Sequence, residues 1–156
     1  MTADVHTCLA GDGDADAAEG TPPVVPDLTA ADVMSRVVVT VDADESVVMA
    51  GYVMQQTAVR HLPVVRHGTV VGIVDDVGLA SCISRLTWSD LRRPVRTAMR
   101  PEVVRVHPGS PLRDVARSLG YSPVRAVLVM DGDRLVGVVT DRDVVAAVAR
   151  DGGGRT

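Results

Sequence analysis

The sequence predicts an α+β fold in which two β-α-β-β-α repeats pack against each other with pseudo-twofold symmetry. The first observation is an internal repeat, because residues 32–79 align without a gap with residues 97–144 when the chain is shifted by sixty-five positions. The second is that β-branched runs and helical apolar spacing follow in the same order in both copies. The third is size: one copy of about fifty residues buries little surface alone, so both copies should share one globule.

Each copy opens with a short β-branched run, VVVTV (37–41) or VVRV (103–106), and the turn formers DADES or HPGSP follow. A helix is then predicted to start near Ser46 in the first copy and near Ser110 in the second. Apolar residues recur at helical spacing in both: Val47, Ala50 and Met54, then Leu112, Val115, Ala116 and Leu119.

Two strands joined by a tight turn come next, LPVV and TVVGIV around RHG, then AVLVM and RLVGVV around DGD. Asp131-Gly132 is a strong hairpin signal. A second helix follows in each copy, DDVGLASCI or DRDVVAAVA. The stretch between the copies, ISRLTWSDLRRPVRTAMR, is expected to supply a connecting helix with Trp88 as a packing anchor.

The domain organisation follows from composition and the repeat. Residues 1–27 hold six acids and no base among Gly, Ala and Pro, which predicts a disordered acidic leader. Residues 28–90 form the first repeat with the connecting helix, residues 91–150 the second repeat, and residues 151–156 a flexible tail.

Composition excludes several classes of function. Hydrophobic residues make up 46% of the chain but aromatic ones only 2%, whereas single-strand nucleic-acid readers use aromatic platforms. The net charge is −4, and the residues after the acidic leader sum to +2, which does not favour duplex binding. Because no secretory signal and no long apolar run occur, we expect a soluble cytoplasmic protein without a membrane partner.

The repeat carries motifs that resemble a known family. The M-x-x-x-V-V-x-V start, the L-P-V-V strand and the G-h-h-T-x-x-D end resemble the CBS domain, and the tandem pair over roughly residues 30–150 resembles a Bateman module in a stand-alone CBS protein. The resemblance implies a regulatory module that binds AMP, ADP, ATP, S-adenosylmethionine or NAD in clefts between the repeats. It also implies a homodimer, no required cofactor, and a separate effector protein as the output.

The two copies differ where the family pattern places its ligand contacts. GVVTDRD (137–143) keeps the T-x-x-D residues as Thr140 and Asp143, whereas GIVDDVG (72–78) has Asp75 and Gly78 there. A carboxylate that accepts from two ribose hydroxyls makes charge-assisted bonds, and Arg142 adds positive charge at the start of the helix. We therefore expect at most one good nucleotide site, centred on the second repeat.

Further contacts follow from the geometry that the family shares. The segment Glu102 to Arg105 and the strand start at Arg125 and Ala126 are expected to line the same cleft. Val103 or Val104 would cover the base, and the Ala126 backbone would read its edge. The alternative for the valines is a plain core position.

An alternative function remains open at this point. Thr140 and Asp143 also fit a helix capping box, and the protein would then be a ligand-free dimerisation module using the VVAAVA helix. No nucleophile-base set, phosphate loop or paired catalytic carboxylates occur, so no enzyme is predicted. His61 and His67 lack ligands at metal spacing, so no metal site is predicted. A third interpretation, a redox-linked accessory protein, would use Cys8 and Cys82.

Overall fold

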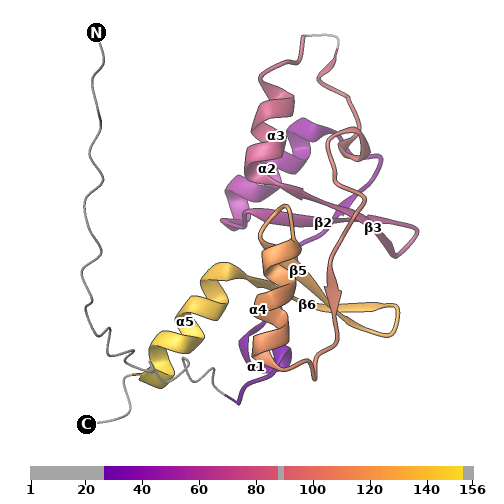
Figure 1. Ribbon diagram of the computed structural model, residues 1–156. Helices are drawn as coiled ribbons and strands as arrows, with labels where there is room; N and C mark the ends of the chain where they lie inside the picture. Colours follow the sequence, from indigo (N-terminus) through magenta and orange to yellow (C-terminus); the bar gives the residue numbers. More distant parts are fainter. Residues whose placement is uncertain (1–26, 88–89, 153–156) are drawn as a thin grey trace, which may run out of the picture.

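The computed structural model describes residues 27–87 and 90–152, and it contains the two predicted repeats as two units, each of three strands and two helices (Figure 1). The first repeat consists of β1 (Val41–Asp42), α2 (Val47–Thr57), β2 (His61–Arg66), β3 (Thr69–Asp75) and α3 (Asp76–Ile83). The second consists of β4 (Arg105–Val106), α4 (Leu112–Tyr121), β5 (Ala126–Asp131), β6 (Arg134–Thr140) and α5 (Asp141–Gly152). The predicted fold class and element order are confirmed.

Each repeat builds a three-stranded sheet whose middle strand is the first strand of the hairpin. β1 pairs parallel with β2, which pairs antiparallel with β3, and β4, β5 and β6 repeat this order. The register of the hairpin is the same in both, since Leu62 faces Val74 and Val127 faces Val139. The predicted turn at Asp131-Gly132 is confirmed, with Gly132 at a φ of 58°.

The two sheets meet through a shared apolar cluster. Val70 and Ile73 of β3 belong to this cluster. They pack against Ala126 and Leu128 of β5 and against Val124 just before β5, and all five side chains are buried. Each repeat also has its own cluster, under α2 and α3 or under α4 and α5. The described residues therefore pack around three apolar clusters, one in each repeat and one between the two sheets.

The segments that lead into the repeats, residues 28–40 and 93–104, are exchanged between them; we call them the lead-in segments. The first contains α1 (Ala30–Val33), and its Ala30 is fully buried in the cluster of the second repeat. The second contains η2 (Val95–Thr97), a turn of 3₁₀ helix, and its Val95 is fully buried in the cluster of the first repeat. Each repeat is thus completed by the other's lead-in segment.

The two lead-in segments make equivalent backbone hydrogen bonds, at positions sixty-five residues apart in the chain. Ala30 donates to the Ser110 carbonyl at 2.9 Å, and Val95 donates to the Glu45 carbonyl at 2.7 Å. Further along, Ser35 pairs with Val138 of β6, and its equivalent Arg100 pairs with Ile73 of β3. The exchange is therefore a symmetric feature of the fold.

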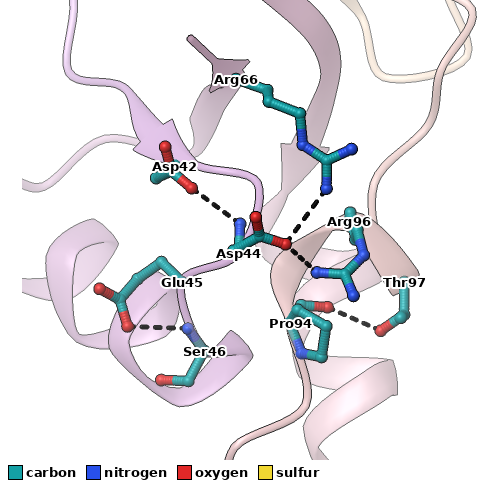
Figure 2. Close-up of polar contacts among 8 residues, drawn as sticks. All are labelled: Asp42, Asp44, Glu45, Ser46, Arg66, Pro94, Arg96 and Thr97. Carbon is teal, nitrogen blue, oxygen red and sulfur yellow. Dashed lines mark hydrogen bonds and ion pairs between the residues drawn. The ribbon is translucent and has the colours of Figure 1, made fainter.

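Side chains reinforce the exchange at the first repeat (Figure 2). Asp44, in the turn between β1 and α2, accepts at Oδ1 from Arg66 at the end of β2 and from Arg96 of the second lead-in segment. Because these side chains are exposed, their main effect is to set the position of the lead-in segment.

Two expectations about the elements need correction, and others lie outside the described residues. The first strands are shorter than the valine runs that predicted them, because residues 37–40 and 103–104 lie outside the sheets. No α-helix occurs in the described part of the connecting stretch, residues 84–87 and 90–104, where a 3₁₀ turn takes its place. Trp88, the leader up to residue 26 and the tail from residue 153 lie outside the described residues.

Candidate functional site

A cavity of about 280 Å³ opens between the two repeats, and we call it the inter-repeat cleft. Three stretches form its walls: the lead-in segment of the first repeat, the junction between α2 and β2, and the junction between β6 and α5. The lining residues are Ser35, Val37, Val38, Val39, Ala58, Val59, Arg60, His61, Val138, Thr140, Asp141, Arg142 and Asp143. The cleft therefore brings together Thr140, Arg142 and Asp143, three of the residues expected from the sequence to contact a ligand.

Thr140 ends β6 and Asp143 lies in the first turn of α5, and both are half-buried. Asp143 Oδ2 accepts from the Thr140 backbone N–H at 2.8 Å and from the Thr140 hydroxyl at 2.7 Å. Oδ1 takes part in neither bond. The carboxylate is thus held in a fixed orientation at the cleft with one oxygen left out of the cap.

The same cap occurs at two other T-x-x-D sequences. Asp32 accepts from Thr29, and Asp90 from Thr87, each through Oδ2 and both Thr donors, and these bonds hold the pKa of either carboxyl below its usual range. The motif alone therefore signals a cap. Among these three pairs, Thr140 and Asp143 are the pair that lines the inter-repeat cleft.

The first repeat uses the equivalent positions differently. Asp75 is the N-cap of α3, and its Oδ1 accepts from the Gly78 backbone N–H at 2.8 Å. A Cβ at position 78 would lie 2.6 Å from that oxygen. A side chain at position 78 would therefore require the Asp75 carboxylate to shift from this position.

The structure places the second set of predicted contacts away from the inter-repeat cleft. Val103 packs against the central cluster, Val104 packs against the second repeat's cluster, and Ala126 is buried in the central cluster. Arg125 is exposed and its Nε lies 3.5 Å from Asp141. None of these four lines the inter-repeat cleft.

The physical reason is the exchange of the lead-in segments. The cleft next to Thr140 receives the lead-in segment of the first repeat, so Val38, Val39, Arg60 and His61 occupy the places expected for residues sixty-five positions later. The alignment of the chain with itself could have suggested these residues, because it pairs each of them with one of the expected contacts. It could not show which repeat supplies the walls of which cleft.

Charged and polar groups surround the first-repeat wall of the cleft. Arg60 Nε donates to Asp76 Oδ2 at 2.7 Å, and this hydrogen bond lowers the pKa of Asp76 and raises that of Arg60. His61 Nε2 lies 2.7 Å from the Val124 carbonyl of the second repeat. Arg142, on the opposite wall, is exposed. The cleft thus combines aliphatic walls with one half-buried carboxylate and two guanidinium groups.

A family model for the CBS domain matches residues 30–85 and again residues 95–150. The chain belongs to the CBS domain family. The Bacillus subtilis CBS domain-containing protein YhcV is 28% identical over 72% of this chain and 80% of its own length. The L-aspartate semialdehyde sulfurtransferase of Methanocaldococcus jannaschii is 26% identical over 81% of this chain, which spans only 24% of that enzyme.

Solved structures of CBS pairs share the fold. CBSX2 in complex with AMP is 27% identical, with a TM-score of 0.68 over 80% of this chain and 98% of that one. The Agrobacterium tumefaciens CBS-domain protein ATU1752 is 27% identical, with a TM-score of 0.69 over 76% and 98%. The CBS pair of protein MJ0100, in complex with 5′-methylthioadenosine and S-adenosylmethionine, has a TM-score of 0.72 at 24% identity over 81% and 99%.

Within residues 27–87 and 90–152, no three His, Cys, Asp or Glu side chains lie close enough to hold a metal ion. None of the helices there has the length and apolar character that crossing a bilayer requires.

Proposed function

We propose that this CBS pair is a regulatory module that binds an adenosyl ligand in the inter-repeat cleft. The observation that carries the proposal is the half-buried Asp143, oriented by Thr140, in a cavity with walls from both repeats. The 27% identical CBSX2 in complex with AMP supports this ligand class. AMP, ADP, ATP, NAD and S-adenosylmethionine are the candidate ligands.

Each wall has a role in the proposed complex. Asp143 Oδ1 accepts from the ribose hydroxyls, and the base lies between the aliphatic side chains of Val38, Val39 and Val59. The phosphate groups lie near the first turn of α5, where the positive end of the helix dipole and the exposed Arg142 favour an anion. A cavity near the lower end of the usual range of about 300–1,000 Å³ fits one nucleoside moiety.

The output of the module is proposed to be mechanical. Ligand in the cleft contacts both repeats, so it changes how they pack, and a separate effector protein or the second subunit of a homodimer reads that change. The sulfurtransferase relative does not argue for catalysis here, because this chain covers 24% of its length.

A second candidate function is a ligand-free dimerisation module. The Thr140–Asp143 cap has two counterparts, at Thr29 and Thr87, that do not line the inter-repeat cleft, so a cap of this kind does not require a ligand site. In that case the T-x-x-D segment stabilises α5 and nothing more, and stability depends on protein concentration without depending on nucleotide.

Calorimetric titration with the five candidate ligands tests the proposal. We expect at least one to bind, and Asp143→Ala to weaken it by about ten- to a hundredfold, because charge-assisted bonds to the ribose are lost. The same substitution also removes a cap, which stabilises the helix by about 1 kcal/mol.

Asp32→Ala is the matched control, because Asp32 makes the same bonds to Thr29 outside the cleft. It should destabilise the protein without changing ligand affinity. Absence of binding by all five ligands, or equal loss of affinity in both variants, would contradict the proposal.

A further inference from the structure

His61 is the first residue of β2, and its half-buried side chain lines the inter-repeat cleft. Its Nε2 lies 2.7 Å from the backbone carbonyl oxygen of Val124, which belongs to the second repeat. A carbonyl oxygen only accepts hydrogen bonds, so Nε2 carries the hydrogen of this bond. The ring of His61 therefore connects the two repeats at a wall of the cleft.

The hydrogen on Nε2 determines what the rest of the ring can do. A neutral imidazole has one N–H group, and its other nitrogen is a hydrogen-bond acceptor. The bond to Val124 uses Nε2 and leaves Nδ1 out. In the neutral ring, Nδ1 is therefore an acceptor for a ligand.

The wall formed by residues 58–61 offers a ligand no other side-chain acceptor. Ala58 and Val59 have no polar side-chain atom, and Arg60 has only donors. Arg60 also donates to Asp76 at 2.7 Å. Val59 is one of the residues proposed to contact the base, so the acceptor of His61 belongs to the same wall as the proposed base contact.

The sixty-five-residue shift shows that His61 and Asp143 are both special to one repeat. It pairs His61 with the buried Ala126 and Asp143 with Gly78. Both polar side chains line the same cleft, although they come from different repeats. The fold accepts alanine and glycine at the equivalent positions, which favours a role in binding for both polar groups.

We propose that His61 determines which base the cleft accepts: Nδ1 accepts a hydrogen bond from the 6-amino group of adenine, while Asp143 binds the ribose. This inference rests on the proposed function, because it concerns the base of the same ligand. A site that hydrogen-bonds a group of its ligand rejects an analogue without that group, since a polar atom of the site then loses its partner. The cleft should therefore prefer adenine to a purine that lacks the amino group.

A double-mutant cycle between His61 and the amino group tests the assignment. The full chain and His61→Ala are titrated calorimetrically at about pH 8, above the range in which histidine side chains usually change charge. The ligands are AMP and purine riboside 5′-monophosphate, in which a hydrogen atom replaces the 6-amino group. The wild type should bind AMP about tenfold more tightly than the analogue, and His61→Ala should bind both equally.

A purely structural role of His61 predicts a different result. Loss of the bond to Val124 would then weaken both nucleotides by the same factor and leave the ratio of their affinities unchanged. Circular dichroism checks the fold of His61→Ala, which has the residue found at the equivalent position 126.

The failure of this inference can be told apart from the failure of the proposed function. Equal binding of AMP and the analogue by the wild type, or an unchanged ratio in His61→Ala, would overturn the inference alone. If neither nucleotide binds, the inference fails, and the proposed function fails with it only when the other four candidate ligands do not bind either.

The imidazole nitrogen signals of His61 provide a second measurement that needs no variant. Long-range ¹⁵N–¹H NMR of the wild type at the same pH should show Nε2 protonated and Nδ1 unprotonated. Saturating AMP should shift the Nδ1 signal much more than the analogue does. A protonated Nδ1, or equal shifts with both nucleotides, would contradict the inference.

Discussion

Arg60 and Arg125 are equivalent residues with different surroundings. Each pairs with the equivalent carboxylate of the following helix, Asp76 or Asp141, and both pairs are largely exposed. Arg60 lines the inter-repeat cleft, whereas Arg125 lies outside it. Substitution of each arginine can therefore show whether a ligand binds in the inter-repeat cleft, beside Arg60, or next to Arg125 as the sequence analysis expected.

We predict that Arg60→Ala weakens binding of a phosphorylated ligand such as AMP by about tenfold, since a charge-assisted bond contributes about 1.5–3 kcal/mol at most. Arg125→Ala should leave the affinity unchanged. Both variants should melt near the wild-type temperature, because exposed ion pairs stabilise little. Calorimetry measures the affinities, and a larger loss in Arg125→Ala would show that the cleft is wrongly assigned.

At the residue scale the sequence predicted part of the site. Thr140, Arg142 and Asp143 follow from a local motif that one repeat keeps and the other loses. Val103, Val104, Arg125 and Ala126 were expected from the geometry that the family shares, and because the lead-in segments are exchanged these residues do not line the inter-repeat cleft. Only long-range pairings such as Ser35 with Val138 reveal the exchange.

At the scale of elements, a glycine in each hairpin receives a methionine from the other repeat's lead-in segment. Met99 lies against Gly72 of β3, and Met34 lies against Gly137 of β6. A Cβ at Gly72 would lie 2.6 Å from Met99 Sδ and 2.8 Å from the Arg100 carbonyl oxygen. That carbonyl accepts from Ile73, so it has little freedom to shift.

Gly72→Ala is therefore predicted to lower the free energy of unfolding by about 1–3 kcal/mol, as overpacking of a tight contact does. Gly120→Ala is the matched control, because Gly120 lies in α4 with nothing within 4 Å of its added Cβ. It should be neutral or stabilising by up to about 1 kcal/mol. Denaturant unfolding measures both, and similar values for the two would contradict the close contact.

The helices and hairpins were predictable because their signals are local. Apolar spacing at Val47, Ala50 and Met54 matches the buried side of α2. The first strands were overestimated because valine runs favour strand by propensity, whereas the residues before β1 and β4 belong to the lead-in segments and lie outside the sheets. The conformation of these valines is therefore set by the packing of the lead-in segments and not by their strand propensity.

At the scale of the whole molecule, the exchange makes each repeat dependent on the other. Ala30 completes the second core, Val95 completes the first, and the inter-repeat cleft has walls from both. Ala58, Val59 and Arg60 line both this cleft and a groove of about 560 Å³ between α2 and α3.

The central claim is that an adenosyl ligand lies between the first repeat's lead-in segment and the start of α5. The most direct test is a backbone amide NMR titration of the full chain with AMP. We predict that the largest shifts fall in residues 37–39, 58–61 and 140–143. Shifts centred on residues 102–105 and 124–126 instead, or none at saturating nucleotide, would contradict the account.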